Sequence, residues 1–230
     1  MIIRRANERG RTQTAWLDSY HAFSFAEYHD PLWMSFGPLR VINDDVIAPN
    51  GGFSMHSHRD MDIMTYVISG ELAHKDNMGN GTLIRPGEIQ RMSAGTGVKH
   101  SEFNASATTP LHLLQIWIEP QTLGLPPGYE QKEIKKRENE WVLIGSDQEH
   151  ADAVLVHQRL NLYVAYLNTS HILKHTMQKP RGWIQVIKGQ ITINDILFSQ
   201  GDAVGFLDET EILITGIQDS ELLLFEMGNK

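Results

Sequence analysis

Two short triplets in the first half of the chain carry side chains that bind transition metals. They are His56-Ser57-His58 and, after an intervening hairpin, His100-Ser101-Glu102. Side chains at positions i and i+2 of a strand point to the same face, about 7 Å apart. Two such strands facing each other across a small barrel could converge three imidazoles and one carboxylate on one ion. The spacing therefore predicts a metal site formed by His56, His58, His100 and Glu102.

The absence of cysteine narrows the chemistry of this site. The chain contains no cysteine, so disulfides, thiolate metal clusters and thiol catalysis are excluded and the ligands must be nitrogen and oxygen. Three imidazoles and a carboxylate suit Fe(II), Mn(II), Cu(II), Ni(II) or Zn(II), and they leave one or two coordination positions open. A substrate or dioxygen needs such an open position.

The first triplet is weak evidence when it is taken alone. With 11 histidines in 230 residues, about half a His-x-His triplet is expected by chance, and two surface histidines explain it equally well. The second triplet strengthens the prediction, because the turn-rich segment 76–81 and the Pro86-Gly87 turn lie between the two triplets. These turns would fold the chain back so that the two pairs meet.

Composition and charge indicate a folded protein and argue against several partners. Apolar residues make up 41% and charged residues 21% of the chain, which is typical of globular domains. Lys and Arg supply 20 positive charges against 28 negative ones, and the net charge of −8 disfavours direct nucleic-acid binding. Since no long apolar stretch resembles a signal peptide or a membrane span, we expect a cytoplasmic protein.

The sequence predicts that the elements positioning the triplets are mainly strands. Short β-rich runs separated by Gly, Asn, Asp or Pro turns predict a sandwich or barrel; examples are 39–43, 65–68, 111–118, 160–167 and 221–226. The best helical candidate, 129–141, is too charged for a core and is expected on the surface. The Pro- and Gly-rich segment 119–129 indicates a connection, and we place two domains at 1–125 and 126–230.

An internal repeat supports two related domains. Aligning Gly70 with Gly189, an offset of 119, matches residues 64–72 with 183–191. A second turn, 85–89, then matches 199–203 at an offset of 114. Two β-domains in tandem explain the match, and a chance similarity of short β-runs is the alternative.

These motifs resemble a known family. The segment from Gly52 to Asp62, ending in Gly70, resembles the first cupin motif, and Pro86-Gly87 followed by His100 and Asn104 resembles the second. More narrowly, the chain resembles pirins over most of residues 12–120, in the segments 56–59, 70–76, 79–81, 84–88 and 95–102. The resemblance implies an all-β bicupin, two tandem cupin (jelly-roll) barrels with one metal centre in the N-terminal barrel.

The resemblance also bears on the choice of ligands. It implies a metal held at His56, His58, His100 and Glu102, in agreement with the spacing argument. In the general cupin motif an acidic residue at the position of Asp62 is often a ligand, whereas pirin-like proteins take the carboxylate from the position of Glu102. We expect Asp62 to accept a hydrogen bond from a metal-bound histidine or to serve the fold.

The second copy departs from the metal-binding pattern. The offset of 119 aligns His56 and His58 with His175 and Met177, and the offset of 114 aligns His100 and Glu102 with Ile214 and Gly216. The C-terminal barrel is therefore predicted to be metal-free and to serve packing, substrate shielding or partner binding. In the first copy, His74 is expected to be solvated. The aromatic runs 23–28 and 31–34 either wall a pocket or pack as core and lid.

The resemblance implies a metal-dependent dioxygenase similar to quercetin 2,3-dioxygenase. It would cleave the heterocycle of a flavonol, or another flat aromatic molecule, with O2 and release CO, with Glu102 as the general base. We expect one divalent ion, Fe(II) first, and Cu, Ni, Mn, Co and Zn fit the same donors. The alternatives are a non-catalytic regulatory protein that binds a transcription-related protein partner, and a sensor of aromatic ligands. Native substrate, native metal and oligomeric state are left open.

Overall fold

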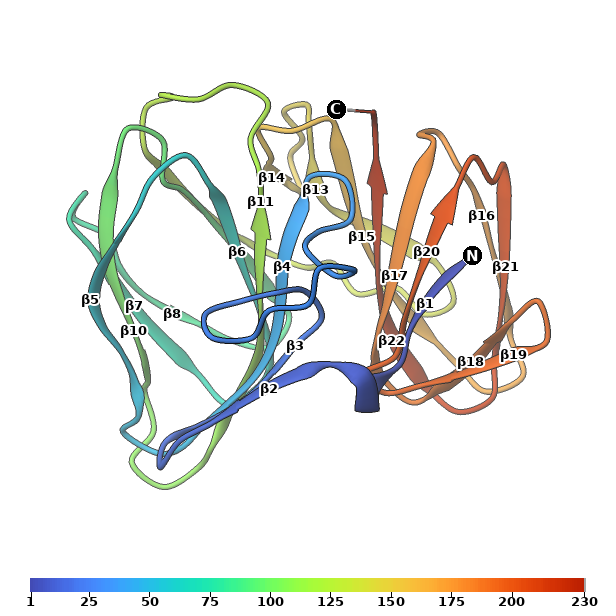
Figure 1. Ribbon diagram of the computed structural model, residues 1–230, viewed down its shortest axis with the longest axis horizontal. Coiled ribbons are helices and arrows are strands. Elements are labelled where there is room, and N and C mark those ends of the chain that lie inside the picture. The colour runs from blue at the N-terminus through green and yellow to red at the C-terminus, as the bar shows by residue number, and fades with distance from the viewer. Residues whose placement is uncertain (230) are drawn as a thin grey trace. The chain divides into compact units, whose positions relative to one another are not determined.

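The computed structural model describes residues 1–229, which form strands joined by turns and loops (Figure 1). In this part of the chain the only helical segment is the short 3-10 helix η1 (Ala6–Glu8). The predicted all-β fold class is confirmed. Within the same residues, no helix has the length and apolar character needed to cross a lipid bilayer.

The chain divides into two compact units. The N-terminal unit consists of Gly10–Glu133 and Val154–Gln158, and the C-terminal unit of Met1–Arg9, Ile134–Ala153 and the chain from Arg159 onward. Residues 1–9 belong to the C-terminal unit because β1 (Ile2–Arg4) pairs antiparallel with β20 (Ala203–Leu207). Each unit thus gathers separate segments, whereas the ranges expected from the sequence, 1–125 and 126–230, are contiguous.

The N-terminal unit is built from two antiparallel sheets. The smaller sheet has the order β5 (Gly52–His58), β10 (Val98–Asn104), β7 (Leu72–Asp76) and β8 (Gly81–Ile84). The larger sheet has the order β12 (Gly128–Glu133), β9 (Glu88–Ser93), β6 (Asp62–Ser69), β11 (Leu111–Ile118), β4 (Leu39–Ile47), β3 (Leu17–His21) and β2 (Gly10–Gln13). The short strand β14 (Val154–Leu155) also belongs to this unit.

The C-terminal unit repeats this arrangement. Its smaller sheet has the order β16 (Ile172–Thr176), β21 (Glu211–Gly216), β18 (Gln190–Ile193) and β19 (Ile196–Ser199). Its larger sheet runs β1, β20, β17 (Arg181–Lys188), β22 (Ser220–Met227), β15 (Leu160–Leu167) and β13 (Trp141–Ser146). The strand order therefore matches that of the N-terminal unit from β12 to β3.

The aligned glycines confirm the internal repeat. Gly70, between β6 and β7, has φ +84°, and Gly189, between β17 and β18, has φ +83°. A Cβ on Gly70 would lie 2.9 Å from the Leu111 Cα, and one on Gly189 would clash with the Asp219 carbonyl oxygen. Both turns therefore need the left-handed backbone and the missing side chain that glycine provides.

The helix expected over 129–141 is wrong. Residues Gly128–Glu133 form β12, which pairs with β9, and Trp141 begins β13. The polar residues of this segment hold the strand in place: Glu130 accepts a hydrogen bond from Arg91 at 2.8 Å, and Gln131 donates one to the Leu83 carbonyl at 2.9 Å. Pairing with β9 therefore outweighs the helical preference that the sequence suggests for residues 129–133.

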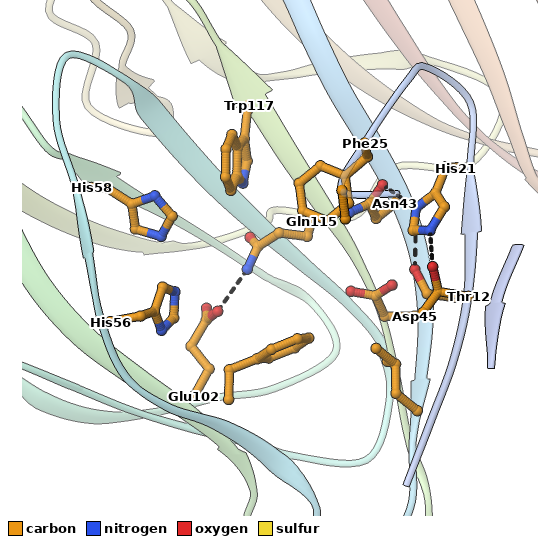
Figure 2. Close-up of a pocket in the computed structure, with 14 residues that line it drawn as sticks. Thr12, His21, Phe25, Asn43, Asp45, His56, His58, Glu102, Gln115 and Trp117 are labelled. Atoms are coloured by element: carbon orange, nitrogen blue, oxygen red, sulfur yellow. Dashed lines mark hydrogen bonds between the residues drawn. The ribbon is translucent and has the colours of Figure 1, made fainter. Parts of the chain in front are cut away.

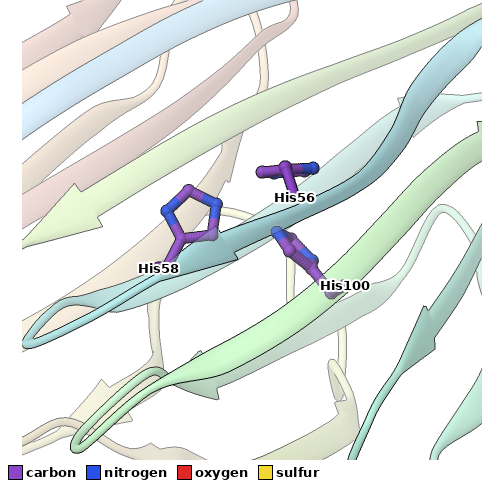
Figure 3. Close-up of side chains that lie close together, drawn as sticks. All are labelled: His56, His58 and His100. Atoms are coloured by element: carbon purple, nitrogen blue, oxygen red, sulfur yellow. The ribbon is translucent and has the colours of Figure 1, made fainter.

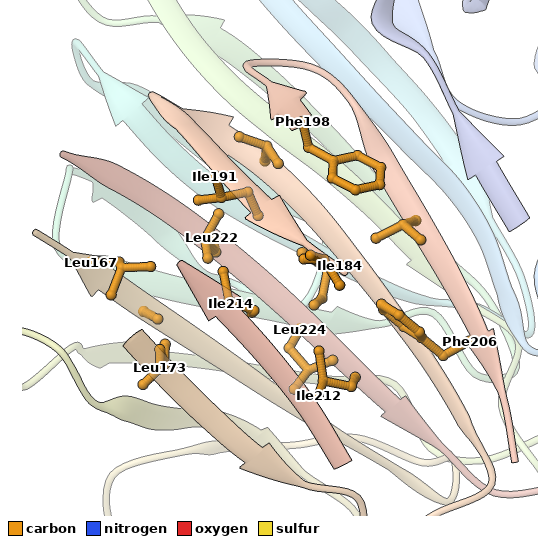
Figure 4. Close-up of a cluster of buried hydrophobic side chains, with 14 residues drawn as sticks. Leu167, Leu173, Ile184, Ile191, Phe198, Phe206, Ile212, Ile214, Leu222 and Leu224 are labelled. Atoms are coloured by element: carbon orange, nitrogen blue, oxygen red, sulfur yellow. The ribbon is translucent and has the colours of Figure 1, made fainter. Parts of the chain in front are cut away.

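The interior of the C-terminal unit is filled with hydrocarbon side chains (Figure 4). The offset of 119 matches His56 with His175, and in the structure His56 lies opposite His100 while His175 lies opposite Ile212. The counterparts of His100 and Glu102 are therefore Ile212 and Ile214, two residues earlier than the offset of 114 gives. Since the turn before β21 is shorter than the one before β10, the offset changes between these strands. Both isoleucines are buried in the core.

Candidate metal centre

A β-bulge in β5 sets the direction of the predicted ligands. Along β10 and β5, His100 lies opposite His56, but Glu102 lies opposite Phe53, so β5 carries one extra residue in this interval. Ser54 and Met55 are both exposed there. A bulge of this kind shifts the alternation of side chains. Phe53, His56 and His58 consequently all line the same pocket.

Three predicted ligands meet at this place. The nitrogen donors of His56, His58 and His100 lie within 4.8 Å of one another. The ring centroids are 4.4 Å apart for His56 and His100 and 4.9 Å apart for His58 and His100. Figure 3 shows His56 and His58 on one strand and His100 on its neighbour. The geometry is that of a group able to hold a metal ion.

The imidazoles are prepared to act as donors. Nδ1 of His56 donates a hydrogen bond to the Ser54 carbonyl at 2.8 Å, which leaves the Nε2 lone pair available in the neutral ring. Burial, reinforced by His56, lowers the pKa of His58 to about 4. Burial, reinforced by neighbouring histidines, lowers the pKa of His100 to about 2. Neutral rings are the form that coordinates metals.

His100 gives the strongest indication that this cluster fits an ion. The residue is 1% exposed, and within residues 1–229 neither of its ring nitrogens has a hydrogen-bond partner. Buried polar atoms are nearly always partnered, because leaving one unpaired costs free energy. A bound cation would satisfy one of these nitrogens.

Glu102 lies beside the cluster and is held from the opposite sheet. Its Oε2 accepts a 2.7 Å hydrogen bond from Gln115 on β11, and Thr65 on β6 lies 3.5 Å from Oε1. Burial raises the pKa of Glu102 to about 7, although both hydrogen bonds act in the opposite direction. The carboxyl can therefore hold or release a proton near neutral pH.

The carboxylate of Glu102 groups with a different pair of histidines. Its oxygen lies within 4.8 Å of the donors of His74 and His100, so His100 belongs to both groups. The expectation that His74 is solvated is wrong, because His74 is 2% exposed. Since Glu102 lies opposite His74 in the β10–β7 ladder, the two side chains share one face of the sheet. Nε2 of His74 lies 3.2 Å from Asp76 Oδ2.

A cavity of about 300 Å³ adjoins the three histidines (Figure 2). Aromatic side chains form part of its walls: Trp117 packs edge-on against His58 at 4.9 Å between ring centroids, and Phe25 packs edge-on against Trp117 at 5.4 Å. Of the aromatic runs considered in the sequence, Phe25 lines this cavity, whereas Phe23 is buried in the core. The cavity volume is at the lower end of the range for small-molecule sites, about 300–1,000 Å³.

Asp62 has a structural role. It begins β6 rather than continuing β5, and the turn before it has a positive φ at Asp60. Its carboxylate accepts hydrogen bonds from Ser93 Oγ at 2.5 Å and from the His157 backbone N–H at 2.6 Å. Asp62 therefore joins the segment 154–158 to the larger sheet, and no hydrogen bond links it to His56, His58 or His100 within the described residues.

Sequence reasoning did not single out Gln115, Thr65 and Asp45. Gln115 and Thr65 lie opposite each other in β11 and β6, and Asp45 lies in β4. All three are buried. For Gln115 and Thr65, a polar residue among apolar neighbours of a strand was the available signal, because a side chain there must face a partner or a cavity. Asp45 follows Asn43 and Asp44 in β4, so it gave no such signal.

Comparisons with known proteins agree with this description. A family model described as Pirin matches residues 3–118, and one described as the quercetinase C-terminal cupin domain matches residues 143–227. A protein of Escherichia coli (strain K12) named quercetin 2,3-dioxygenase is 46% identical over 228 residues, covering 99% of this chain and 98% of its own.

Two further relatives are similar along nearly their whole length. A protein of Pasteurella multocida named putative quercetin 2,3-dioxygenase is 43% identical over 230 residues, covering 98% of both chains. The solved structure of a bacterial pirin from Escherichia coli in complex with nickel(II) has a TM-score of 0.94 at 45% identity, covering 99% of both chains.

Proposed function

The chain belongs to the pirin family, and from this premise we propose that it is a metal-dependent dioxygenase that opens the heterocycle of a flavonol. O2 is the co-substrate and CO is released. The observation that carries the proposal is that histidines of the cluster line a cavity together with aromatic side chains. The oxygen of a flat substrate would face the histidine cluster, and its ring would lie against the aromatic side chains. The names of the relatives support the choice of a flavonol.

We propose that His56, His58 and His100, whose donors cluster, hold one divalent ion together with Glu102, which groups with His100. When bound, the ion would orient the substrate oxygen and stabilise its negative charge. The nickel(II) complex of the relative supports a divalent transition metal. Fe(II) and a cytoplasmic location, expected from the sequence, stay predictions.

Glu102 is the general base of the proposal. A carboxylate beside the histidine cluster can accept the proton of a flavonol 3-hydroxyl. Gln115 fixes Oε2 through the 2.7 Å hydrogen bond, and the Thr65 hydroxyl lies 3.5 Å from Oε1. The substrate anion then reacts with O2, the two oxygen atoms enter the ring-opened product, and the carbon between the broken bonds leaves as CO.

The aromatic walls position the substrate. Trp117 and Phe25 meet edge to face, and Phe53 lines the same cavity from β5. Aromatic surfaces of this kind bind a flat ring and exclude water from it. Exclusion of water favours attack on the ring by O2 over side reactions.

The test is oxygen uptake and CO release with quercetin, after the protein has been loaded with metal under anaerobic conditions. We expect both signals with the natural protein, and their loss in His58→Ala and Glu102→Gln. His171→Ala, which changes an exposed histidine of the C-terminal unit, should retain them. Metal binding without turnover of any flavonol would overturn the enzymatic proposal and favour the regulatory alternative.

A further inference from the structure

The cavity has a second polar end that the proposed chemistry does not use. Asp45 projects from β4 in the larger sheet, and Figure 2 shows it across the cavity from His56 and His58. Asp45 and Glu102 are the only carboxyl groups that line this cavity among residues 1–229. Glu102 is already engaged by Gln115. Asp45 therefore needs a separate explanation.

The other polar side chains at this end have hydrogen-bond partners. Nδ1 of His21 lies 2.7 Å from Asn43 Oδ1, and its Nε2 lies 2.8 Å from Thr12 Oγ1. Asn43 Oδ1 can only accept, so Nδ1 of His21 carries the proton and Nε2 accepts from Thr12. This network holds the wall rigid, and His21 has no ring nitrogen left for a ligand.

Asp45 differs from these neighbours. It is 2% exposed, and its Oδ1 has no hydrogen-bond partner in the described part of the chain. Ser19, its cross-strand neighbour on β3, is its hydrogen-bonding side chain. A buried carboxyl oxygen without a partner is rare in folded proteins, because few polar groups are buried at that cost. Because Asp45 lines the cavity, a hydrogen-bond donor on a bound ligand could be the partner of Oδ1.

We propose that Asp45 is a specificity-determining residue that accepts a hydrogen bond from a phenolic hydroxyl at the end of the substrate remote from the histidine cluster. The inference rests on the proposed function, because it takes the ligand to be a flavonol. The cavity then selects aromatic molecules with two features: an oxygen for the metal-binding end and a hydroxyl donor for Asp45. If an apolar side chain stood at position 45, a phenolic hydroxyl entering the cavity would lose its hydrogen bonds to water and gain none. Asp45 therefore favours a substrate whose remote ring carries a hydroxyl over one whose remote ring carries none.

The experiment compares two ligands with the same metal-binding group. Quercetin carries hydroxyls on both outer rings, and 3-hydroxyflavone carries none there. Dissociation constants are measured without oxygen, by absorbance of the flavonol, on the nickel-loaded full-length protein and on three variants. Asp45→Leu removes the acceptor, and Asp45→Asn keeps a neutral one. Asp44→Asn is the matched control, because Asp44 pairs with His112 at 2.6 Å and does not line the cavity.

At pH 8, above the raised pKa of about 7 of Asp45, the carboxylate is charged and should favour quercetin. A hydrogen bond to a charged group corresponds to about ten- to a hundredfold in affinity. We expect Asp45→Leu to weaken quercetin binding by at least about tenfold and to leave 3-hydroxyflavone within about twofold. Asp45→Asn should be intermediate, and Asp44→Asn should match the natural protein. An unchanged preference in Asp45→Leu, or equal weakening of both ligands, would overturn the inference.

The inference and the proposed function can fail separately. If no flavonol is oxidised but the preference for quercetin depends on Asp45, the dioxygenase proposal fails and the recognition role stands. If quercetin is oxidised and Asp45→Leu retains the KM ratio of the two ligands, the recognition role fails alone. With both correct, Asp45→Leu raises KM for quercetin and largely retains kcat.

Discussion

Nε2 of Gln115 donates a 2.7 Å hydrogen bond to Oε2 of Glu102 across the interior of the N-terminal unit. The two residues come from opposite sheets, β11 and β10, and both are buried. Thr65 donates to Oε1 of Gln115 at 3.1 Å and thereby fixes which end of the amide faces the carboxylate. The orientation and the proton affinity of Glu102 thus depend on residues outside the metal-binding triplets.

Gln115→Met should raise the pKa of Glu102 above about 7, because the hydrogen bond from Gln115 is the largest influence that lowers it. The titration is measured by infrared or carbon NMR spectroscopy of the carboxyl in the metal-free protein. Loss of the bond should also reduce the free energy of unfolding by about 1–3 kcal/mol. Gln148→Met, at an exposed position, is the control, and an unchanged titration would show that the bond does not tune Glu102.

Asp45→Asn should stabilise the metal-free protein at pH 8 and have little effect at pH 4. Burial raises the pKa of Asp45 from 3.8 to about 7. The folded state therefore keeps a proton that the unfolded state releases, and stability is lost as pH rises from about 4 through about 7. The gain at pH 8 is at most about 4 kcal/mol. Denaturant unfolding at both pH values measures it, and an equal effect at both would contradict the assignment.

His100→Ala should abolish specific binding of Ni(II). A ligand that binds only the folded state stabilises it by about 2.7 kcal/mol when its free concentration is a hundred times Kd. The natural protein should therefore show a rise in Tm with Ni(II), and His100→Ala should show none. His112→Ala is the control, because Nε2 of His112 pairs with Asp44 and belongs to neither metal-binding group. A retained rise in Tm in His100→Ala would place the ion elsewhere.

Asp62→Asn tests whether this residue serves the fold or the metal. The carboxylate holds Ser93 and the His157 backbone, so its loss should cost about 1–3 kcal/mol of unfolding free energy. Nickel stoichiometry should remain one ion per chain. A fall in stoichiometry under conditions where the variant is fully folded would instead make Asp62 part of the metal site.

Ile214→Ala should destabilise the C-terminal unit by about 2–5 kcal/mol, the cost of a cavity in a packed core. Ile214 is 0% exposed, whereas its neighbour Leu213 is 48% exposed. Leu213→Ala is therefore the matched control and should change the unfolding free energy by less than about 0.5 kcal/mol. Equal effects of the two substitutions would contradict the alternation along β21.

The triplet spacing predicted that His56 and His58 share one face of a strand, because alternation along a strand is a local property. The donors of His100 lie beside them because β10 pairs with β5. The bulge at Ser54 and Met55 was not predictable in the same way. It depends on how β5 pairs with β10, which is decided by residues far away in the sequence. The environment of Glu102 depends on Gln115 and Thr65 from another sheet, so no local pattern reveals it.

The repeat was readable from glycines because a left-handed turn restricts residue type severely. The prediction of a helix over 129–141 was wrong for the opposite reason. Charged residues occur in exposed helices and in exposed strands alike, and here pairing with β9 selects the strand. The offset of 114 failed beyond the Gly87 and Gly201 turns, since turn lengths vary more freely than strand pairing. Buried positions such as His74 and Asp76 depend on the same pairing.

The pairing of β1 with β20 joins strands that are about 200 residues apart in the sequence. Closing so long a loop costs entropy before any contact is gained, and pairings of this kind form slowly. We therefore expect β1 to join its sheet late in refolding, after the local hairpins of the C-terminal unit have formed.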